Sequence, residues 1–282
     1  MPVDISSRIV RHEALNPDHF LLTLEAPPIA RAARAGQFVM LQVREGYDPL
    51  LRRPMSLYRV LPGRRGRIQI LYKVVGEGTR HLSRQPVGTS LKTLGPLGNG
   101  FALSAPASRA GGAGRAPARP LLVAGGVGIA IFPFLVEALR ARRRRPTLLF
   151  GARTRRDLVA LDFFRRRRVP VHLATEDGSA GSRGFVTRLL EPLLRPAEAA
   201  AGTAGTAGTE LYVCGPTPMM RAVREQALAA GVPCQLALES QMPCGIGVCL
   251  GCVVRCREDE DSPVFQRVCT EGPIFDALRV IL

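Results

Sequence analysis

The sequence contains no tryptophan, few other aromatic residues and only two lysines, Lys73 and Lys92. Aromatic residues make up 5% of the 282 positions, and the formal net charge of +16 comes almost wholly from arginine. Nucleic-acid-binding surfaces usually interleave basic residues with aromatic ones or present them on a recognition helix. Because aromatic residues are so scarce, the charge alone does not indicate a nucleic-acid partner, and we expect none.

Secretion signals and long apolar runs are also missing. The segment from Met1 to Val10 has neither the basic region nor the extended apolar region of a secretory signal. The longest uncharged apolar run, from Pro120 to Val136, is shorter than the roughly 20 residues of a membrane helix and is interrupted by glycines and Pro133. We therefore expect a cytoplasmic protein with no membrane partner, in which the seven cysteines do not form structural disulfides.

The pattern of the chain predicts a multi-domain β plus α/β protein. Residues 1–103 carry short alternating apolar runs punctuated by glycine and proline, which predict a small antiparallel β-barrel. Residues 104–119 are rich in Ala, Gly, Pro and Ser and are expected to be a linker or loop. Residues 120–236 alternate strands with helices, the first two helices near 130–142 and 156–166, which predicts a parallel sheet covered on both faces. Within it, 197–209 is expected to be an insertion, and 237–282 form a cysteine-rich end.

Five of the seven cysteines follow residue 243, and this clustering indicates a metal site. Cys244, Cys249 and Cys252 are separated by four and two residues and are followed by Cys269, the spacing of plant-type 2Fe-2S centres. One alternative is a four-cysteine zinc site, which typically has two close cysteine pairs. The other is that the cysteines do not bind a common metal. The fourth ligand stays open at this point, because Cys256 follows Cys252 at a spacing found in 4Fe-4S motifs.

Two turns of the α/β unit are candidates for binding a nucleotide. Glycines between a strand and a helix let a pyrophosphate approach the backbone N–H groups, and ligands of open α/β sheets bind beyond the carboxyl ends of the strands. The residues are Gly125, Gly126 and Gly128 after the first strand, and Cys214, Gly215 and Pro216 after the fourth. The alternatives are a tight turn without a ligand and, for Cys214, a buried structural thiol.

Three segments of the β unit together indicate a cofactor groove. A guanidinium binds a pyrophosphate with two hydrogen bonds, an aromatic ring stacks on a ring system, and a Gly-Thr pair offers N–H and hydroxyl donors. The segments are Arg53, Pro54, Met55 and Ser56; Leu71, Tyr72 and Lys73; and Gly78 and Thr79.

The motifs taken together resemble the ferredoxin-reductase-like electron-transfer subunit of type B dihydroorotate dehydrogenase. The resemblance spans nearly the whole chain, and its most specific part is the cysteine segment with the later run from Val268 to Phe275. It implies an FAD-binding barrel at 1–103, a Rossmann-like NAD-binding domain at 120–236 and a 2Fe-2S domain at 237–282. It also implies that Cys244, Cys249, Cys252 and Cys269 hold the cluster, which leaves Cys256 a free thiol.

The resemblance also implies a function. Electrons would flow from dihydroorotate through an FMN-containing catalytic subunit, the cluster and FAD to NAD, in pyrimidine biosynthesis. The chain would be an NAD-linked oxidoreductase subunit in a heterotetramer of two chains of each kind, and no residue is assigned as a catalytic acid or base.

Two other functions share part of these features. A flavin and iron-sulfur subunit that passes NAD(P)H electrons to ferredoxin, sulfur or hydrogenase chemistry would carry every cofactor motif, and a zinc-bound adaptor would carry the cysteines alone. The choice between NAD and NADP stays open as well. Glu176 and Asp177 suit a free ribose, whereas Arg153 and Arg155 suit a 2′-phosphate.

Overall fold

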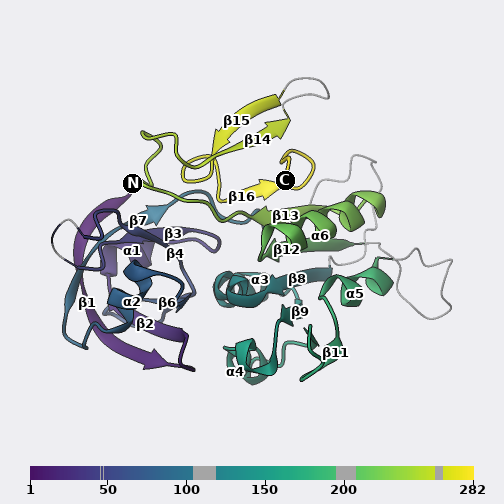
Figure 1. Ribbon diagram of the computed structural model, residues 1–282, viewed down its shortest axis with the longest axis horizontal. Coiled ribbons are helices and arrows are strands. Elements are labelled where there is room, and N and C mark those ends of the chain that lie inside the picture. The colour runs from purple at the N-terminus through teal and green to yellow at the C-terminus, as the bar shows by residue number, and fades with distance from the viewer. Residues whose placement is uncertain (45, 47, 104–118, 195–207, 258–262) are drawn as a thin grey trace.

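The computed structural model describes residues 1–44, 46, 48–103, 119–194, 208–257 and 263–282 (Figure 1). The predicted linker before Arg119 and the predicted insertion up to residue 207 lie outside these residues. Figure 1 shows a purple and blue β structure beside a teal and green α/β structure, with a small yellow hairpin above both. No helix among the described residues is long and apolar enough to cross a membrane.

The N-terminal part is an antiparallel sheet of seven strands in the order β4-β3-β7-β1-β2-β6-β5. Its strands are β1 (Val3–Ala14), β2 (His19–Glu25), β3 (Phe38–Leu41), β4 (Arg53–Ser56), β5 (Arg59–Leu61), β6 (Arg67–Lys73) and β7 (Ser90–Leu97), with the short helices α1 (Pro27–Ala32) and α2 (Glu77–Ser83).

One continuous segment closes this sheet into the predicted barrel. The two edge strands, β4 and β5, are consecutive in the chain; β4 pairs with β3, and β5 pairs with β6. Between them, the Leu57 N–H donates to the Gln37 carbonyl at 3.0 Å, and the Tyr58 N–H donates to the Gln69 carbonyl at 2.9 Å. The interior is filled by alternate residues of the strands, among them Leu22, Leu24, Ile68 and Ile70, all fully buried.

The second sheet has the order β11-β10-β9-β8-β12-β13-β16, and all its pairs are parallel except the one between β13 and β16. Its strands are β8 (Arg119–Gly125), β9 (Thr147–Ala152), β10 (Val171–Thr175), β11 (Ser182–Arg183), β12 (Thr209–Cys214), β13 (Cys234–Ala237) and β16 (Ile274–Asp276). The helices are α3 (Phe132–Ala141), α4 (Leu161–Arg166), α5 (Thr187–Leu190) and α6 (Thr217–Ala229), with 3-10 helices η1 (Gly126–Ile131), η2 (Arg155–Asp157) and η3 (Glu191–Leu193).

Helices cover both faces of this sheet, as its nearly continuous apolar strands predict. Along β8, Leu121 and Val123 pack into one core with α5 and α6, and Leu122 and Ala124 pack into the other core with α3 and α4. The helix expected near 156–166 is shorter than predicted, because Ala160 has a φ of 63°, which the right-handed helix does not allow.

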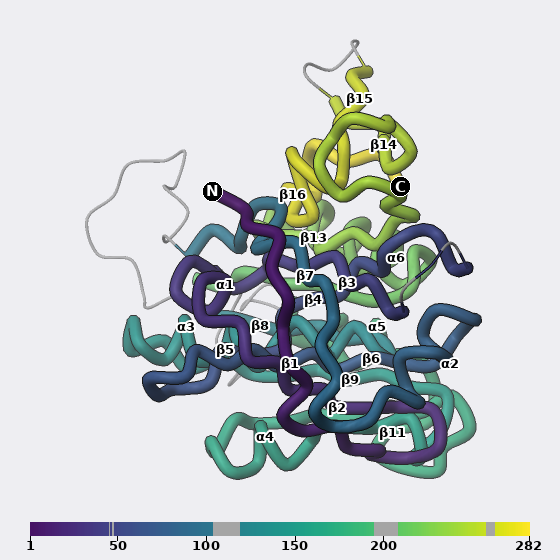
Figure 2. The backbone as a smooth tube through the Cα atoms, turned by 90° about the vertical axis from the view of Figure 1, so that its left-hand side faces the viewer, coloured from purple at the N-terminus to yellow at the C-terminus, as the bar shows by residue number. Residues whose placement is uncertain are grey.

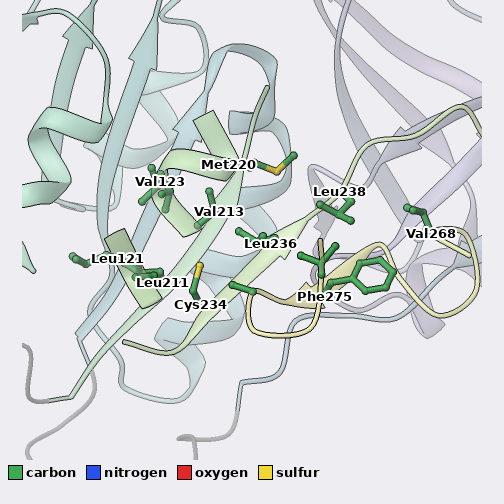
Figure 3. Close-up of a cluster of buried hydrophobic side chains, with 14 of the residues drawn as sticks. Leu121, Val123, Leu211, Val213, Met220, Cys234, Leu236, Leu238, Val268 and Phe275 are labelled. Atoms are coloured by element: carbon green, nitrogen blue, oxygen red, sulfur yellow. The ribbon is translucent and has the colours of Figure 1, made fainter. Parts of the chain in front are cut away.

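The C-terminal residues form a small unit whose core is continuous with that of the parallel sheet. Strands β14 (Val253–Arg257) and β15 (Pro263–Arg267) make a separate two-stranded sheet. Val268 and Phe275 lie in the same apolar cluster as Val213 of β12 and Met220 of α6, as Figure 3 shows. The same cluster includes Met40 of the barrel, so this core reaches all three parts of the chain.

Asn99 joins the end of the barrel to the C-terminal segment. Its amide nitrogen donates to the carbonyls of Glu271 and Ile274, both at 2.9 Å, and its side-chain oxygen accepts from the Ile274 N–H at 2.9 Å. Gly98 brings the chains this close, because a Cβ there would lie 2.6 Å from Pro273 Cδ. Since Ile274 begins β16, the same contact fixes an edge strand of the parallel sheet, seen next to β13 in Figure 2.

We predict that Asn99→Ala destabilises the protein by about 3 kcal/mol, because it leaves three backbone groups without their partners in a partly buried site. Thermal unfolding followed by circular dichroism measures the loss. Asn99→Asp keeps the acceptor for the Ile274 N–H but sets a carboxylate oxygen against the carbonyls of Glu271 and Ile274, so it should cost at least as much as Asn99→Ala. Equal melting temperatures for wild type and Asn99→Ala would contradict the role given to this side chain.

Candidate functional site

A cavity of about 1030 Å³ lies at the carboxyl ends of the parallel strands, where open α/β sheets bind ligands. Most of the residues predicted for the nucleotide turns converge there from two neighbouring strands, β8 and β12. Those that line the cavity are Gly125, Gly126, Gly128, Gly215 and Pro216. The structure thus brings the two predicted turns together at the point where the strand order reverses.

Gly128 and Cys214 bring these two turns into direct contact. A Cβ on Gly128 would lie 2.6 Å from the Cys214 carbonyl carbon and 2.9 Å from the Gly215 nitrogen, so no larger residue fits. The Cys214 side chain is 4% exposed and is not among those that line the cavity. Burial raises the pKa of its thiol, so Cys214 stays a neutral packing residue, and its backbone shapes the turn.

One end of the cavity carries the charged residues that were candidates for the adenosine ribose. Glu176 and Arg153 both line it. The Asp177 carboxylate instead accepts hydrogen bonds from the Ser179 N–H at 3.0 Å and the Ser179 hydroxyl at 2.6 Å, and these lower its pKa. Of the two ribose candidates, Glu176 and Asp177, only Glu176 lines the cavity.

The other end of the cavity contains Glu239, which the sequence analysis did not single out as a site residue. It follows β13, is exposed where it lines the cavity, and has a raised pKa because the surrounding protein desolvates its carboxylate. The sequence signal that could have identified Glu239 is its position just beyond a strand end, next to the cysteine segment. It places a carboxyl group that ionises reluctantly beside Gly215 and Pro216.

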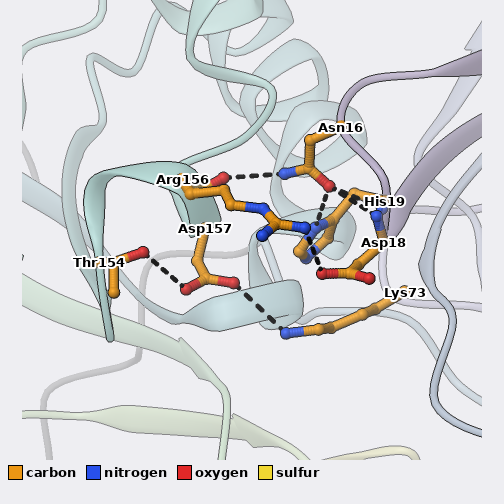
Figure 4. A network of polar contacts seen from close by, with 7 residues as sticks. All are labelled: Asn16, Asp18, His19, Lys73, Thr154, Arg156 and Asp157. Carbon is orange, nitrogen blue, oxygen red and sulfur yellow. Dashed lines mark hydrogen bonds and ion pairs between the residues drawn. The ribbon is translucent and has the colours of Figure 1, made fainter.

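The barrel supplies the facing wall of the same cavity and is tied to it by a polar bridge, shown in Figure 4. Lys73 and His19 line the cavity, and Lys73 Nζ lies 3.3 Å from an Asp157 carboxylate oxygen of η2. Beside this pair, Asn16 donates to the Arg156 carbonyl at 2.8 Å, and Arg156 forms an ion pair with Asp18 at 3.1 Å. Lys73 was predicted to contact a cofactor, whereas its partner Asp157 was not foreseen.

The predicted flavin segments lie next to one another on the barrel surface. The Arg53 guanidinium lies directly against Gly78; a Cβ there would be 2.7 Å from Arg53 Cζ. The Thr79 hydroxyl accepts from the Val75 and Gly76 N–H groups at 2.9 and 3.1 Å and so orders the loop before α2. Pro54 and Ser56, on the same strand β4 as Arg53, are half-buried. Arg53 is thus held where it can bind a phosphate, beside a backbone with no side chain in the way.

Three of the predicted flavin residues turn their side chains into the protein. Tyr72 is 3% exposed, its hydroxyl hydrogen-bonds to His12 Nε2 at 2.8 Å, and its ring stacks on Phe20 at 5.6 Å. Met55 packs inside the barrel, and Leu71 packs toward the α/β unit. These positions can meet a ligand only through their backbone, so the ring that was expected to stack on a cofactor is not Tyr72.

The four predicted cluster cysteines form one interacting group in and around the loop from Cys244 to Cys252. Burial disfavours the Cys244 thiolate, but the N–H groups of Ile246, Cys249 and Val248 outweigh it and lower the Cys244 pKa to about 6. Burial and a hydrogen bond with Cys252 raise the Cys269 pKa to about 12, and Cys269 also senses the charge of Cys244. Backbone donors aimed at sulfur are what a thiolate cluster requires.

Cys256 stands apart from this group. It is fully buried on β14, burial raises the pKa of its thiol, and the charged group that acts on it is Arg279 rather than another cysteine. The thiols of the cluster group are spread around the loop: among the described residues, no three His, Cys, Asp or Glu side chains converge on a position for one metal ion. The four thiols and the backbone N–H donors fit a thiolate-held cluster, and Cys269, unlike Cys256, interacts with the other thiols of this group.

The Arg267 side chain joins the cluster loop to the segment that carries Cys269. Arg267 contacts Glu271 with Nε to Oε2 at 2.9 Å and donates from Nη1 to the Gly247 carbonyl at 3.1 Å. Hydrogen bonds from Arg267 lower the Glu271 pKa to about 2. On the other side, Gly245 packs on Met40 of β3, so the loop is held between the barrel and its own hairpin.

We predict that Cys269→Ser lowers the iron content and removes the visible absorption of the cluster, whereas Cys256→Ser preserves both, because Cys269 interacts with the thiols of Cys252 and Cys244 and Cys256 with no cluster thiol. Iron analysis and absorption spectroscopy of the purified variants provide the measurement. Loss of iron in Cys256→Ser with full iron in Cys269→Ser would reverse the ligand assignment.

Comparisons with known proteins agree with this geometry. The iron-sulfur cluster binding domain of dihydroorotate dehydrogenase B matches residues 239–281, and the oxidoreductase NAD-binding domain matches residues 122–225. A dihydroorotate dehydrogenase B (NAD(+)) electron transfer subunit from Desulforamulus reducens is 36% identical over 94% of this chain and 93% of its own length. A homolog from Aquifex aeolicus is 31% identical over the whole of both chains.

Solved structures show the same fold. A chain from the structure of NADH-dependent reduced ferredoxin-NADP oxidoreductase has a TM-score of 0.81 and 28% identity, covering 98% of this chain and 90% of that one. A ferredoxin NADP+ reductase from Neisseria gonorrhoeae has a TM-score of 0.64 and 18% identity over 81% of this chain and 92% of its own, and so shares the fold alone. By its sequence identity over nearly the full length and its cluster domain, the chain belongs to the family of dihydroorotate dehydrogenase B electron transfer subunits.

Proposed function

We propose that this chain carries electrons between NAD and an FMN-containing catalytic subunit that oxidises dihydroorotate to orotate, through FAD and a 2Fe-2S cluster. The observation that supports this most strongly is that the three sites lie in parts of the chain that pack against one another. The nucleotide cavity, the groove at Arg53 and the four-thiol loop belong to parts that share one core and meet around Asn99.

Each group would supply a different step of electron transfer when bound. FAD exchanges a hydride with NAD and passes single electrons, which is what a 2Fe-2S cluster accepts. The chain binds and orients these groups: Arg53 holds a pyrophosphate, the N–H groups after β8 face the nucleotide phosphates, and the loop donors around Cys244 stabilise its thiolate. No side chain is assigned as a general acid or base.

The exposed surface of the cluster loop fits contact with a partner subunit. Cys249 is exposed, and three apolar neighbours point outward with it: Ile246 is 50% exposed, Val248 73% and Leu250 60%. Exposed apolar groups this close together are typical of protein contacts. The catalytic subunit would cover them and approach the cluster there, in an assembly of two chains of each kind.

A second candidate function is electron transfer to a ferredoxin-type partner. The similarity to the NADH-dependent reduced ferredoxin-NADP oxidoreductase chain favours it, since that chain is 28% identical and covers almost the same length. The two functions share the cofactor sites, so the partner protein distinguishes them.

Reconstitution with a catalytic subunit tests the proposal directly. We expect the complex to reduce NAD with dihydroorotate, and we expect Cys249→Ser to abolish this activity while FAD stays bound, because the variant removes an exposed cluster ligand. Cys234→Ser, which changes a thiol on strand β13 outside the cluster loop, is the control. NAD reduction at the wild-type rate by Cys249→Ser would refute the path, and reduction of ferredoxin alone would favour the second function.

The position of Glu176 predicts a preference for NAD over NADP. Its carboxylate lines the cavity and would repel a 2′-phosphate, whereas Asp177 is engaged with Ser179. We expect Glu176→Gln to raise kcat/KM for NADP about tenfold, equivalent to about 1.4 kcal/mol. Asp177→Asn, the control, should leave the ratio of kcat/KM values for the two coenzymes near that of wild type. Identical ratios in all three proteins would remove Glu176 from coenzyme selection.

A further inference from the structure

A second cavity, of about 770 Å³, lies between the barrel and helix α4. The polar bridge of Figure 4 stands between the two cavities: Asn16 and Arg156 line this one, while His19, Lys73 and Asp157 line the nucleotide cavity. None of the residues predicted to bind FAD or NAD lines the second cavity. Any ligand of the second cavity would therefore be a molecule other than the FAD and NAD expected at the predicted sites.

The second cavity carries a moderate excess of positive charge. Most of its arginines contact a carboxylate: Arg11 pairs with Glu13, Arg59 and Arg167 with Glu137, Arg156 with Asp18, and Arg165 with Asp162. Two carboxylates, Glu13 and Asp162, line it. Its arginines are Arg11, Arg59, Arg156, Arg165, Arg166 and Arg167. Among the described residues Arg166 has no ion-pair partner, so its charge is available to a ligand. Such an excess of guanidinium groups around one hollow favours an anion that accepts several hydrogen bonds, above all a phosphate.

An aromatic platform holds two of these arginines in place. Arg167 lies over the Phe163 ring with its Cζ 3.9 Å from the ring centroid, and Arg59 lies 5.2 Å from the same centroid. Both guanidinium groups contact one carboxylate oxygen of Glu137, at 2.7 and 2.8 Å. Because a single carboxylate serves two guanidinium groups, the cluster keeps an uncompensated positive charge. Nε of Arg59 is buried and has no hydrogen-bond partner.

Apolar side chains make up the smaller part of the lining, most of it polar, and they offer a planar group only a limited contact surface. Leu21 and Tyr58 contribute to it from the barrel, and Leu158 and Val159 from the segment before α4. Tyr58 packs edge-on against Phe163 with ring centroids 6.0 Å apart.

From these features we propose that the second cavity binds a nucleoside phosphate, with the phosphate among the arginines and the base against the apolar side chains. The site borders the nucleotide cavity without sharing its lining, because the consecutive residues Arg156 and Asp157 of η2 line one cavity each. The site is independent of the cofactor motifs and of the electron partner.

The test uses the full-length, FAD-loaded protein and isothermal titration with guanosine 5′-monophosphate, cytidine 5′-monophosphate and inorganic phosphate at physiological ionic strength. The variant Arg165→Gln/Arg166→Gln removes two exposed charges of the cavity. The control Arg64→Gln/Arg65→Gln removes two exposed arginines from the turn between β5 and β6. We expect at least one nucleotide to bind wild type and control equally, and the cavity variant about tenfold more weakly.

Three results would overturn the proposal. The first is that the nucleotides do not distinguish the proteins. They would bind the cavity variant and the control equally, which would show unspecific attraction to a basic protein, or they would bind none of the proteins. The second is inorganic phosphate binding as tightly as either nucleotide, which would mean an anion site without a base pocket. The third is competition between the bound nucleotide and NADH in NADH oxidation by ferricyanide, which would place the nucleotide in the first cavity.

Discussion

The hydrogen bonds of Asn99 determine how the three parts of this protein meet. One side chain at the end of the barrel satisfies the carbonyl of Glu271 and both backbone groups of Ile274, and Gly98 lets the two chains approach closely enough for this. Ile274 then begins the strand that completes the parallel sheet beyond β13. Without these hydrogen bonds, the barrel would lose its direct link to the segment that carries both Cys269 and strand β16.

The packing around Asn99 also sets the barrel opposite the α/β unit. Among the described residues, two large cavities are lined by residues of both parts. The carboxyl ends of the parallel strands point toward the barrel, and the bridge of Lys73 with Asp157 and of Arg156 with Asp18 holds the barrel wall opposite them. Each of these ion pairs is partly exposed and contributes little stability on its own. These ion pairs instead fix which barrel residues line the nucleotide cavity and which line the arginine-rich cavity.

The motifs that depend on local geometry could be predicted from the sequence, and those that depend on packing could not. The cysteine spacing indicated Cys244, Cys249 and Cys252, the family resemblance added Cys269, and the glycine turns after two strands lie at the nucleotide cavity. Tyr72 was expected at a cofactor but lies against Phe20 and His12, because side chains alternate between the two faces of a strand and the sequence does not say which face is the groove. The edge strand at Ile274 pairs with a strand about forty residues earlier, which no local pattern reveals.

The central claim is that one chain conducts electrons from NADH through a flavin to its own cluster, and an anaerobic titration with NADH tests it most directly. Visible absorption follows the flavin, and low-temperature EPR follows the cluster. The account predicts that the flavin band bleaches while a one-electron 2Fe-2S signal appears, in the absence of any partner subunit. A protein reconstituted with iron and FAD that remains EPR-silent and unbleached under NADH would contradict it.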